Sequence, residues 1–143
     1  DREAWVTEAV AAGAQVLTGG KARGAFFEPT VVLEAPRSAR VCSEEVFAPL
    51  VVVNPFDDYK AAVAEVNESR LGLQGAVFTN NLEHAMYAFD EMQTGGVVIN
   101  DISSFRVDHM PYGGVKSSGT GREGVKYAIE EMTEMKLMVM SRL

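Results

Sequence analysis

The sequence predicts an α/β domain built on parallel strands. Two observations carry the prediction: short apolar runs alternate with amphipathic segments of helical period, and the loops between them are short. The apolar runs are Leu50–Val53, Gly75–Thr79 and Val97–Asn100. The first is apolar without interruption, as is typical of a strand covered on both faces. Because parallel crossovers are right-handed, we expect a β-α-β-α-β core with the three strands in one sheet.

Two helices are expected between these strands. The first covers residues 58–67 after a cap at Asp57 or Asp58, and the second follows a cap at Asn80 or Asn81. In both, apolar side chains recur every three or four residues, so each helix should turn one face inward. The expected inward residues are Tyr59, Ala62, Val63 and Val66 in the first helix, and Leu82, Ala85, Met86 and Phe89 in the second.

The flanking segments are predicted from the same patterns. The chain opens in a helical pattern that ends at Gly13, since glycine favours the position just after a helix. Extended segments follow at 15–17 and 26–33, where Pro29 restricts the second to an edge or an irregular strand. A last helix is expected over 121–132, with the inward residues Val125, Ala128, Ile129 and Met132.

Composition indicates a globular protein without a nucleic-acid or membrane partner. A chain of 143 residues is long enough to bury a core. Its net charge is −7 and its 13 Lys and Arg are scattered, which disfavours binding to phosphate backbones and anionic membranes. The single cysteine permits no internal disulfide, so we expect a cytoplasmic location. Because the chain starts within a helix and without methionine, we expect it to be part of a longer protein.

The first candidate site is the segment Ser43-Glu44-Glu45-Val46-Phe47-Ala48-Pro49, which leads into strand 50–53. A carboxylate can accept hydrogen bonds from two neighbouring ribose hydroxyls, and an aromatic ring can lie against a flat heterocycle. Glu44 or Glu45, together with Phe47, can supply both contacts. The alternative is that the acids are solvated and Phe47 belongs to the core.

The second candidate site is the long aperiodic segment from 101 to about 120. Loops of this length inside compact domains are usually functional or disordered. This one follows strand 97–100, at the edge where open α/β sheets bind ligands. Arg106 can receive an anionic group of a substrate, or it can pack on Phe105 as a surface arginine. The other large side chains of the segment are His109, Met110 and Tyr112.

Three further patterns carry less weight. Residues 119–124 match G-x-G-x-x-G, but no strand precedes them, so entry into a helix explains these glycines better than a dinucleotide site. Cys42 lies next to two acids, which disfavour a reactive thiolate, so we expect a small buried hydrophobe. His84 and His109 are far apart in sequence, and with one cysteine they form no metal signature.

Five segments, in chain order, resemble motifs of the NAD(P)-dependent aldehyde dehydrogenase superfamily. Glu44–Pro49 resembles E-E-[IV]-F-[GA]-P, and Pro111–Gly119 resembles P-F-G-G-x-K-x-S-G. Segments 24–31, 67–79 and 95–100 resemble G-x-[FY]-x-x-P-T-[VI], N-x-x-x-x-G-L-x-x-x-[VI]-[FY]-[ST] and G-x-[VI]-x-[VI]-N. The five motifs occur in the family's order, and the resemblance covers essentially the whole chain.

The resemblance implies an enzyme that oxidises an aldehyde to a carboxylic acid with NAD or NADP. In this family a cysteine thiolate adds to the aldehyde, hydride passes to the nicotinamide, and water cleaves the thioester. A glutamate acts as base and an asparagine completes the oxyanion hole. All three residues lie upstream of the matched region, so Cys42 is not the nucleophile. The resemblance therefore implies a partial chain: residues 1–132 as the carboxyl-terminal portion of the catalytic domain, inactive alone, and 133–143 as an oligomerisation strand.

The resemblance also implies roles for single residues. Glu45 matches the acid that binds the nicotinamide ribose hydroxyls, and Phe47 matches the ring on the nicotinamide side. Tyr112 matches an aromatic residue, usually Phe, at the wall of the aldehyde channel. Phe105 and Arg106 fall in the variable substrate loop. That loop is similar to the loop of members that handle lactaldehyde or glyceraldehyde 3-phosphate, although neither the aldehyde nor the choice of NAD over NADP is decided.

The end of the chain resembles the segment through which family members join a neighbouring subunit's sheet. Its apolar residues occur at both parities from Lys136 to Met140, and no later strand follows in sequence. We therefore expect a homo-oligomer that forms through residues 135–140. The alternative function is a self-contained α/β binding or assembly module.

Overall fold

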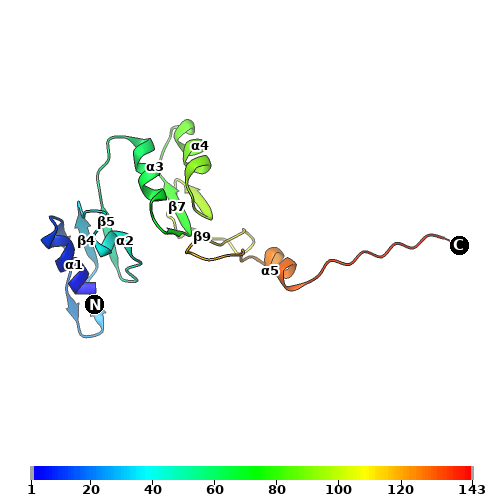
Figure 1. Ribbon diagram of the computed structural model, residues 1–143, viewed down its shortest axis with the longest axis horizontal. Coiled ribbons are helices and arrows are strands. Elements are labelled where there is room, and N and C mark those ends of the chain that lie inside the picture. The colour runs from blue at the N-terminus through cyan, green and yellow to red at the C-terminus, as the bar shows by residue number, and fades with distance from the viewer. Residues whose placement is uncertain (1, 143) are drawn as a thin grey trace. The chain divides into compact units, whose positions relative to one another are not determined.

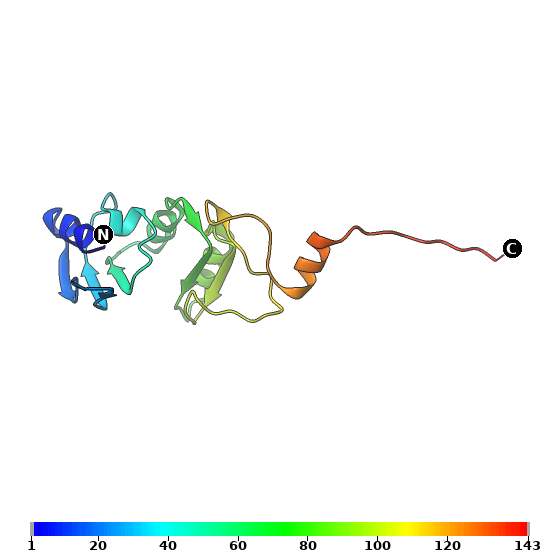
Figure 2. The same ribbon diagram turned by 90° about the horizontal axis from the view of Figure 1, so that it is seen from below.

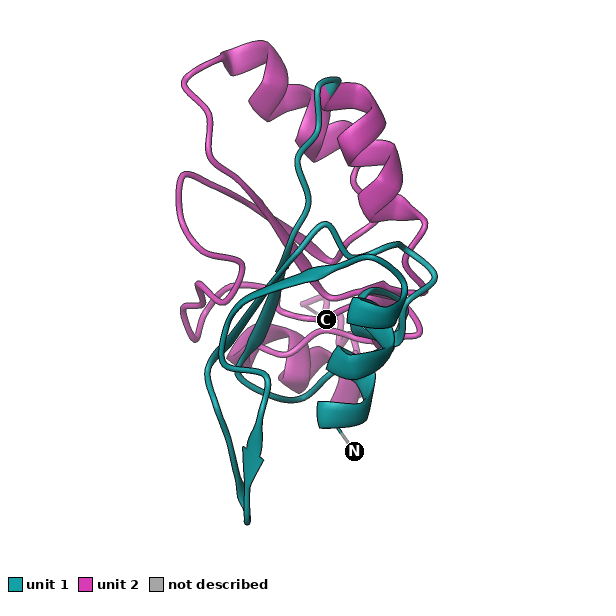
Figure 3. Ribbon diagram, turned by 90° about the vertical axis from the view of Figure 1, so that its left-hand side faces the viewer, with its two compact units in different colours: residues 1–58 teal, residues 59–143 magenta. Residues whose placement is uncertain are grey.

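The structure is a computed structural model that describes residues 2–142, and the chain divides into two compact units. Unit 1 comprises residues 1–58 and unit 2 comprises residues 59–143 (Figure 3). Each unit contains helices and a pair of parallel strands (Figures 1 and 2). The α/β class with parallel strands predicted from the sequence is therefore confirmed.

Unit 1 is organised around a three-stranded sheet of order β1-β4-β5. Strand β1 (Gln15–Thr18) pairs antiparallel with β4 (Thr30–Leu33), and β4 pairs parallel with β5 (Leu50–Val53). The central strand β4 buries Val32 completely. The expected extended segment 26–33 is thus divided at Pro29, and its second half is a central strand.

Two helices and a short hairpin complete unit 1. Helix α1 (Arg2–Ala11) ends before Gly13, whose φ of +107° is a conformation that glycine adopts easily, so the predicted helix end is confirmed. Strands β2 (Ala22–Arg23) and β3 (Phe26–Phe27) form the hairpin. The short helix α2 (Arg40–Ser43) was not predicted, because a single turn has no measurable period.

Small side chains fill the core of unit 1. Cys42 packs against this core but is only half-buried, so the burial that we predicted for it is partial. Residues Val51 and Val53 of β5, in contrast, are 52% and 46% exposed, so the prediction that both faces of this strand are covered is wrong. The buried cluster consists of Ala9, Ala14, Val32, Ala35, Ala39 and Val41.

Unit 2 contains a parallel β-α-β unit. Strand β7 (Gln74–Val77) runs parallel to β8 (Gly96–Ile99), and helix α4 (Leu82–Glu91) connects them. Helix α3 (Tyr59–Asn67) packs beside α4. The side chain of Asn81 accepts hydrogen bonds from the first backbone N–H groups of α4, which confirms one of the two predicted caps.

The strand pairing differs from the single sheet that we predicted. Strand β5 pairs with β4 over the register Thr30↔Leu50 to Leu33↔Val53, and β7 pairs with β8. The three predicted strands are therefore divided between two ladders. The prediction missed that the segment after Pro29 supplies a parallel partner for β5.

The rest of unit 2 is irregular. Two short strands, β6 (Leu71–Gly72) and β9 (Val115–Lys116), pair antiparallel and anchor the middle of the long loop. Helix α5 (Val125–Met132) begins four residues later than predicted, after Gly124 with φ +114°. Residues 133–142 are extended and exposed, and no described strand pairs with them.

The faces of α4 and α5 that we expected to be inward are largely exposed, whereas in α3 the predicted inward residue Val63 is buried. In α4, Leu82 and Phe89 are 75% and 66% exposed, whereas the buried residue is Ala88. In α5, Ile129 is 57% exposed, and most of the other residues predicted to be inward are exposed as well. The prediction of burial is wrong here, because an apolar stripe shows which face needs a cover but does not supply one. None of the helices in the described chain has both the length and the apolar character needed to cross a bilayer.

Candidate functional site

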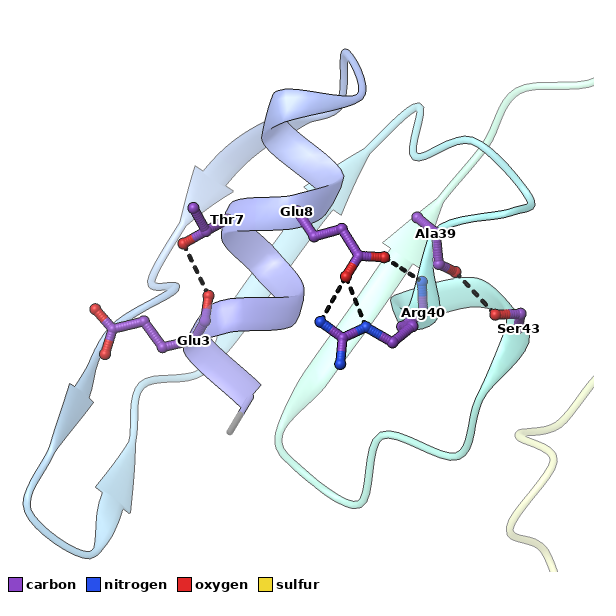
Figure 4. Close-up of polar contacts among 6 residues, drawn as sticks. All are labelled: Glu3, Thr7, Glu8, Ala39, Arg40 and Ser43. Atoms are coloured by element: carbon purple, nitrogen blue, oxygen red, sulfur yellow. Dashed lines mark hydrogen bonds and ion pairs between the residues drawn. The ribbon is translucent and has the colours of Figure 1, made fainter.

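The loop that carries the first candidate site follows a helix held in place by an ion pair. Arg40, at the start of α2, donates from Nε to Glu8 Oε2 at 2.6 Å, and its backbone N–H donates to Glu8 Oε1 at 3.4 Å (Figure 4). The hydrogen bond from the Arg40 side chain holds the pKa of Glu8 below its ordinary value. The guanidinium also lies 5.2 Å from the centre of the Trp5 ring. These contacts attach α2 to α1.

The two candidate cofactor residues lie just beyond α2, and both are exposed. Phe47 has 84% of its surface accessible and adopts φ +47°, which side chains with a Cβ rarely do. The alternative that Phe47 belongs to the core is therefore wrong. Glu45 is exposed, and its carboxylate makes no hydrogen bond or ion pair with any described residue. A carboxylate that accepts hydrogen bonds and an open ring are groups that can contact a ribose joined to a flat heterocycle.

In unit 2, Tyr112 and Glu123 form a two-residue antiparallel bridge. The N–H of Tyr112 donates to the carbonyl of Glu123 at 3.1 Å, and the N–H of Glu123 donates back at 2.6 Å. The side chain of Arg106 joins both residues. Its Nη2 lies 2.7 Å from Glu123 Oε2, and its guanidinium carbon lies 4.4 Å from the centre of the Tyr112 ring. Arg106 therefore packs on Tyr112, and the alternative that it packs on Phe105 is not observed.

A cavity of about 210 Å³ adjoins this bridge. Tyr112 and Glu123 both line it, whereas Phe105 and Arg106 do not. Phe105 is 45% exposed, and its carbonyl accepts a hydrogen bond of 2.8 Å from Gln74 of β7. The structure thus brings Arg106 and Tyr112 together and places Phe105 beside the strand. The lining residues are Leu73, Tyr112, Gly113, Gly114, Ser118, Thr120, Gly121, Arg122, Glu123 and Glu131.

Sequence reasoning missed Glu123. It lies within the G-x-G-x-x-G string, where we considered only the glycines, and it is 17 residues from Arg106. The two positions are not related by the spacing of a helix or a strand, so the sequence alone does not predict that they pair. Gly119, Gly121 and Gly124 all have positive φ, a conformation that glycine adopts easily, and α5 begins directly after them.

Close backbone approach explains the glycine at position 95. A Cβ on Gly95 would lie 1.6 Å from the carbonyl oxygen of Gly113. The N–H of Gly95 also lies 3.0 Å from the carbonyl of Gly72. The start of β8 therefore lies directly against the loop that carries Tyr112, and only glycine fits at this point.

Polar motif residues hold the same loop. Lys116 Nζ donates to the carbonyls of Asn67 and Ser69, at 2.7 and 3.0 Å, and so satisfies carbonyls at the carboxyl end of α3. Ser118 Oγ accepts a hydrogen bond of 2.8 Å from the N–H of Gly72. Asn67 bridges to the end of α4, accepting from Gln93 N–H and donating to the carbonyl of Glu91, both at 2.7 Å. The loop is therefore anchored on several sides.

The sequence model of the aldehyde dehydrogenase family matches residues 2–138. The chain belongs to the aldehyde dehydrogenase family, which confirms the resemblance found in the sequence.

Among curated relatives, the chain is 50% identical over 139 residues to 3-sulfolactaldehyde dehydrogenase of Priestia aryabhattai, covering 97% of this chain and 29% of that protein. It is 43% identical over 138 residues to lactaldehyde dehydrogenase of Methanocaldococcus jannaschii, covering 96% of this chain and 29% of that protein. The chain therefore spans about 29% of the length of these curated relatives.

Solved structures give the same picture. Aldehyde dehydrogenase 21 from Physcomitrella patens, in complex with the reaction product succinate, is 51% identical with a TM-score of 0.92, covering 96% of this chain and 29% of that chain. Glyceraldehyde-3-phosphate dehydrogenase GapN from Methanocaldococcus jannaschii, complexed with NADP, is 41% identical with a TM-score of 0.91. The match covers 98% of this chain and 30% of that chain. Betaine aldehyde dehydrogenase from Staphylococcus aureus, in complex with NAD+, is 38% identical with a TM-score of 0.81. The match covers 90% of this chain and 27% of that chain.

Proposed function

We propose that the chain is part of an enzyme that oxidises an aldehyde to a carboxylic acid with NAD or NADP. The match of residues 2–138 to the aldehyde dehydrogenase family is the observation that carries this proposal. Structural relatives that contain NADP or NAD+ support the choice of cofactor. The bound nicotinamide supplies the hydride acceptor for the oxidation.

On the cofactor side, we propose that Glu45 accepts hydrogen bonds from the hydroxyls of the nicotinamide ribose. Its carboxylate is exposed and has no described partner, so it can bind a ligand without first breaking an ion pair. The open ring of Phe47, which is 84% exposed, lies against the nicotinamide side of the cofactor in this proposal. The two residues bind and orient the cofactor, while Arg40 and Glu8 hold the helix before them.

On the substrate side, Tyr112 forms one wall of the aldehyde channel, with Phe105 and Arg106 from the variable loop. The positive charge of Arg106 favours an aldehyde with an anionic end. The names of three relatives include a sulfonate, a phosphate or a dicarboxylate product, which supports this class. We propose small aldehydes with such a group, or with a hydroxyl as in lactaldehyde, as the substrate class.

The reactive sulfur is not supplied by this part of the protein. Cys42 is half-buried against the core of unit 1, and its thiol lies 3.8 Å from the carbonyl of Ala35. The cysteine nucleophile, through which a thiohemiacetal forms, would come from another part of the whole enzyme, together with the general base and the oxyanion-hole asparagine. We therefore propose that residues 1–132 complete a catalytic domain in a cytoplasmic enzyme, and that 133–143 serve as a pairing strand in a homo-oligomer.

The proposal is tested with the full-length protein that contains this chain. Reduction of NAD or NADP is measured by absorbance with sulfonate-, phosphate- and carboxylate-ended aldehydes and with lactaldehyde. We expect turnover by the full-length protein and none by the 143-residue chain. Turnover by the short chain alone would overturn its assignment as a partial chain. A folded full-length protein without turnover on any aldehyde would favour the binding-module alternative.

A further inference from the structure

The guanidinium of Arg106 is engaged from only one edge. Nη2 is bound to Glu123 Oε2 at 2.7 Å, and the flat face lies over the Tyr112 ring at 4.4 Å. No hydrogen bond joins the other nitrogens, Nε and Nη1, to a residue of the described chain. Because a guanidinium offers five N–H donors in a planar fork, a second anion can bind to the free edge while Glu123 keeps its place.

Glu123 reduces the positive charge that such an anion would meet. With a carboxylate 2.7 Å from Nη2, the pair as a whole is close to neutral. An anion at the free edge would be attracted by Arg106. It would also be repelled by Glu123, whose carboxylate would lie only slightly farther from the anion than the guanidinium does. The side chains of Arg106 and Glu123 are 40% and 67% exposed, so water screens both interactions without removing them.

The ion pair itself contributes little to folding. Pairs with this degree of exposure have small effects on stability, because solvent competes for both charges. The position of Glu123 is fixed instead by the two backbone hydrogen bonds to Tyr112, at 3.1 and 2.6 Å. A neutral side chain at position 123 would therefore leave the bridge intact and change mainly the charge beside Arg106.

We propose that Glu123 is a specificity-determining residue, which weakens the attraction of Arg106 for the anionic end of the substrate. This inference rests on the proposed role of Arg106 at the substrate channel. Its consequence is that the enzyme accepts aldehydes with neutral or singly charged ends alongside those with doubly charged ends. The effect grows with the charge of the substrate, since repulsion from Glu123 scales with that charge.

The test measures binding as well as turnover in the full-length protein. Calorimetry gives the dissociation constants of inorganic sulfate and of succinate, and steady-state kinetics give KM for a sulfonate-ended aldehyde and for a neutral carboxamide-ended aldehyde. We expect Glu123→Gln to tighten sulfate and succinate binding about tenfold, as follows from removing one nearby unit charge. We expect KM for the sulfonate-ended aldehyde to fall by a larger factor than KM for the neutral aldehyde, because only the first carries a charge that Glu123 repels.

Two further variants make the test specific. Glu130→Gln removes an acid of the same type from α5, where its partner is Lys126 at 3.9 Å, and should leave anion binding unchanged. In the Arg106→Gln background, Glu123→Gln should bring no gain, because the two residues act as a coupled pair. Glu123→Asp, which keeps the charge but shortens the side chain, should give a smaller gain and serves if the Gln variant does not fold.

The outcomes separate this inference from the function on which it rests. If Arg106→Gln weakens anion binding but Glu123→Gln does not tighten it, the anion site stands and the role of Glu123 is overturned. If Arg106→Gln changes neither anion binding nor KM for the charged aldehyde, the anion-binding role of Arg106 and this inference both fail. Neither result would bear on the proposal that the full-length protein oxidises aldehydes.

Discussion

The carboxylate of Glu8 in α1 holds Arg40 of α2 through both its side chain and its backbone, with Oε2 2.6 Å from Nε and Oε1 3.4 Å from the backbone nitrogen. Helix α2 ends at Ser43, directly before the segment with Glu45 and Phe47. An ion pair near the start of the chain therefore holds the helix that leads into the candidate cofactor loop.

This pair should make stability depend on pH. The pKa of Glu8 in the folded chain is below its ordinary value of 4.5, so the unfolded state binds a proton first as the pH falls. The stabilisation from Glu8 is thus fully present above pH 4.5 and is lost as the pH falls through the lower folded value. We expect Glu8→Gln to lower the thermal midpoint of unfolding at neutral pH. In strong acid, the thermal midpoints of the variant and the parent protein should be the same.

The control for this prediction is Glu3→Gln on the same helix. Among the described residues, the Glu3 carboxylate accepts one hydrogen bond, from the backbone N–H of Ala22 at 3.3 Å. Its effect on the thermal midpoint should therefore be smaller at neutral pH. If the difference between Glu8→Gln and the parent protein stayed constant down to strong acid, the ion pair would not be its source.

Cofactor binding should depend on Glu45 and not on Glu44. Replacing Glu45 by Gln in the full-length protein removes a charged acceptor for two hydroxyls, and hydrogen bonds to charged groups contribute about 1.5–3 kcal/mol. We expect the dissociation constant of NAD or NADP, measured by fluorescence titration, to rise at least about tenfold. Glu44→Gln is the matched control and should change it by less than about twofold. Equal effects of the two variants would contradict the assignment.

The contact between Gly95 and Gly113 should make the first of these positions intolerant of any side chain. A Cβ on Gly95 would lie 1.6 Å from a backbone oxygen, which cannot move as a flexible side chain can. We expect Gly95→Ala to destabilise the fold by about 3 kcal/mol or more, measured by chemical denaturation. At neighbouring Gly96 the Cβ would meet Gln74 at an ordinary 3.5 Å, so Gly96→Ala should change stability much less.

Subunit pairing should depend on the exposed segment at the end of the chain. Leu137, Met138 and Val139 are 85%, 79% and 81% exposed, and no described strand covers them. We expect Met138→Asp to reduce the oligomer of the full-length protein, measured by light scattering after size exclusion, because a charge disfavours pairing at an apolar edge. Ser141→Asp adds the same charge nearby and should have a smaller effect. An unchanged oligomer in Met138→Asp would exclude this segment as the interface.

Local signals in the sequence predicted local structure well. Asn81 caps α4 because its short polar side chain can reach the free N–H groups of the next turn, and the neighbouring residues alone show this. Helix α3 begins at Tyr59, one residue after the predicted cap position Asp58. For Lys116, the sequence indicates a match to a family motif but does not predict its contacts. Its hydrogen-bond partners are the carbonyls of Asn67 and Ser69, which are far away in sequence.

What the sequence did not predict depends on contacts between distant segments. Strands β6 and β9 have two residues each, too few to show a period, and they are strands only because they pair with each other. The pair Arg106–Glu123 likewise joins two loop positions that no pattern connects. For α4 and α5 the period identified an apolar stripe, but no pattern can show whether the described chain covers it.

The left-handed backbone of Phe47 has a consequence for efforts to make the enzyme more robust. Glycine adopts that conformation with less strain, so Phe47→Gly would relax the local chain while removing an exposed ring. A selection for heat tolerance alone would therefore tend to accept such a replacement, and the proposed role of Phe47 predicts that the enriched variants would bind nicotinamide less firmly.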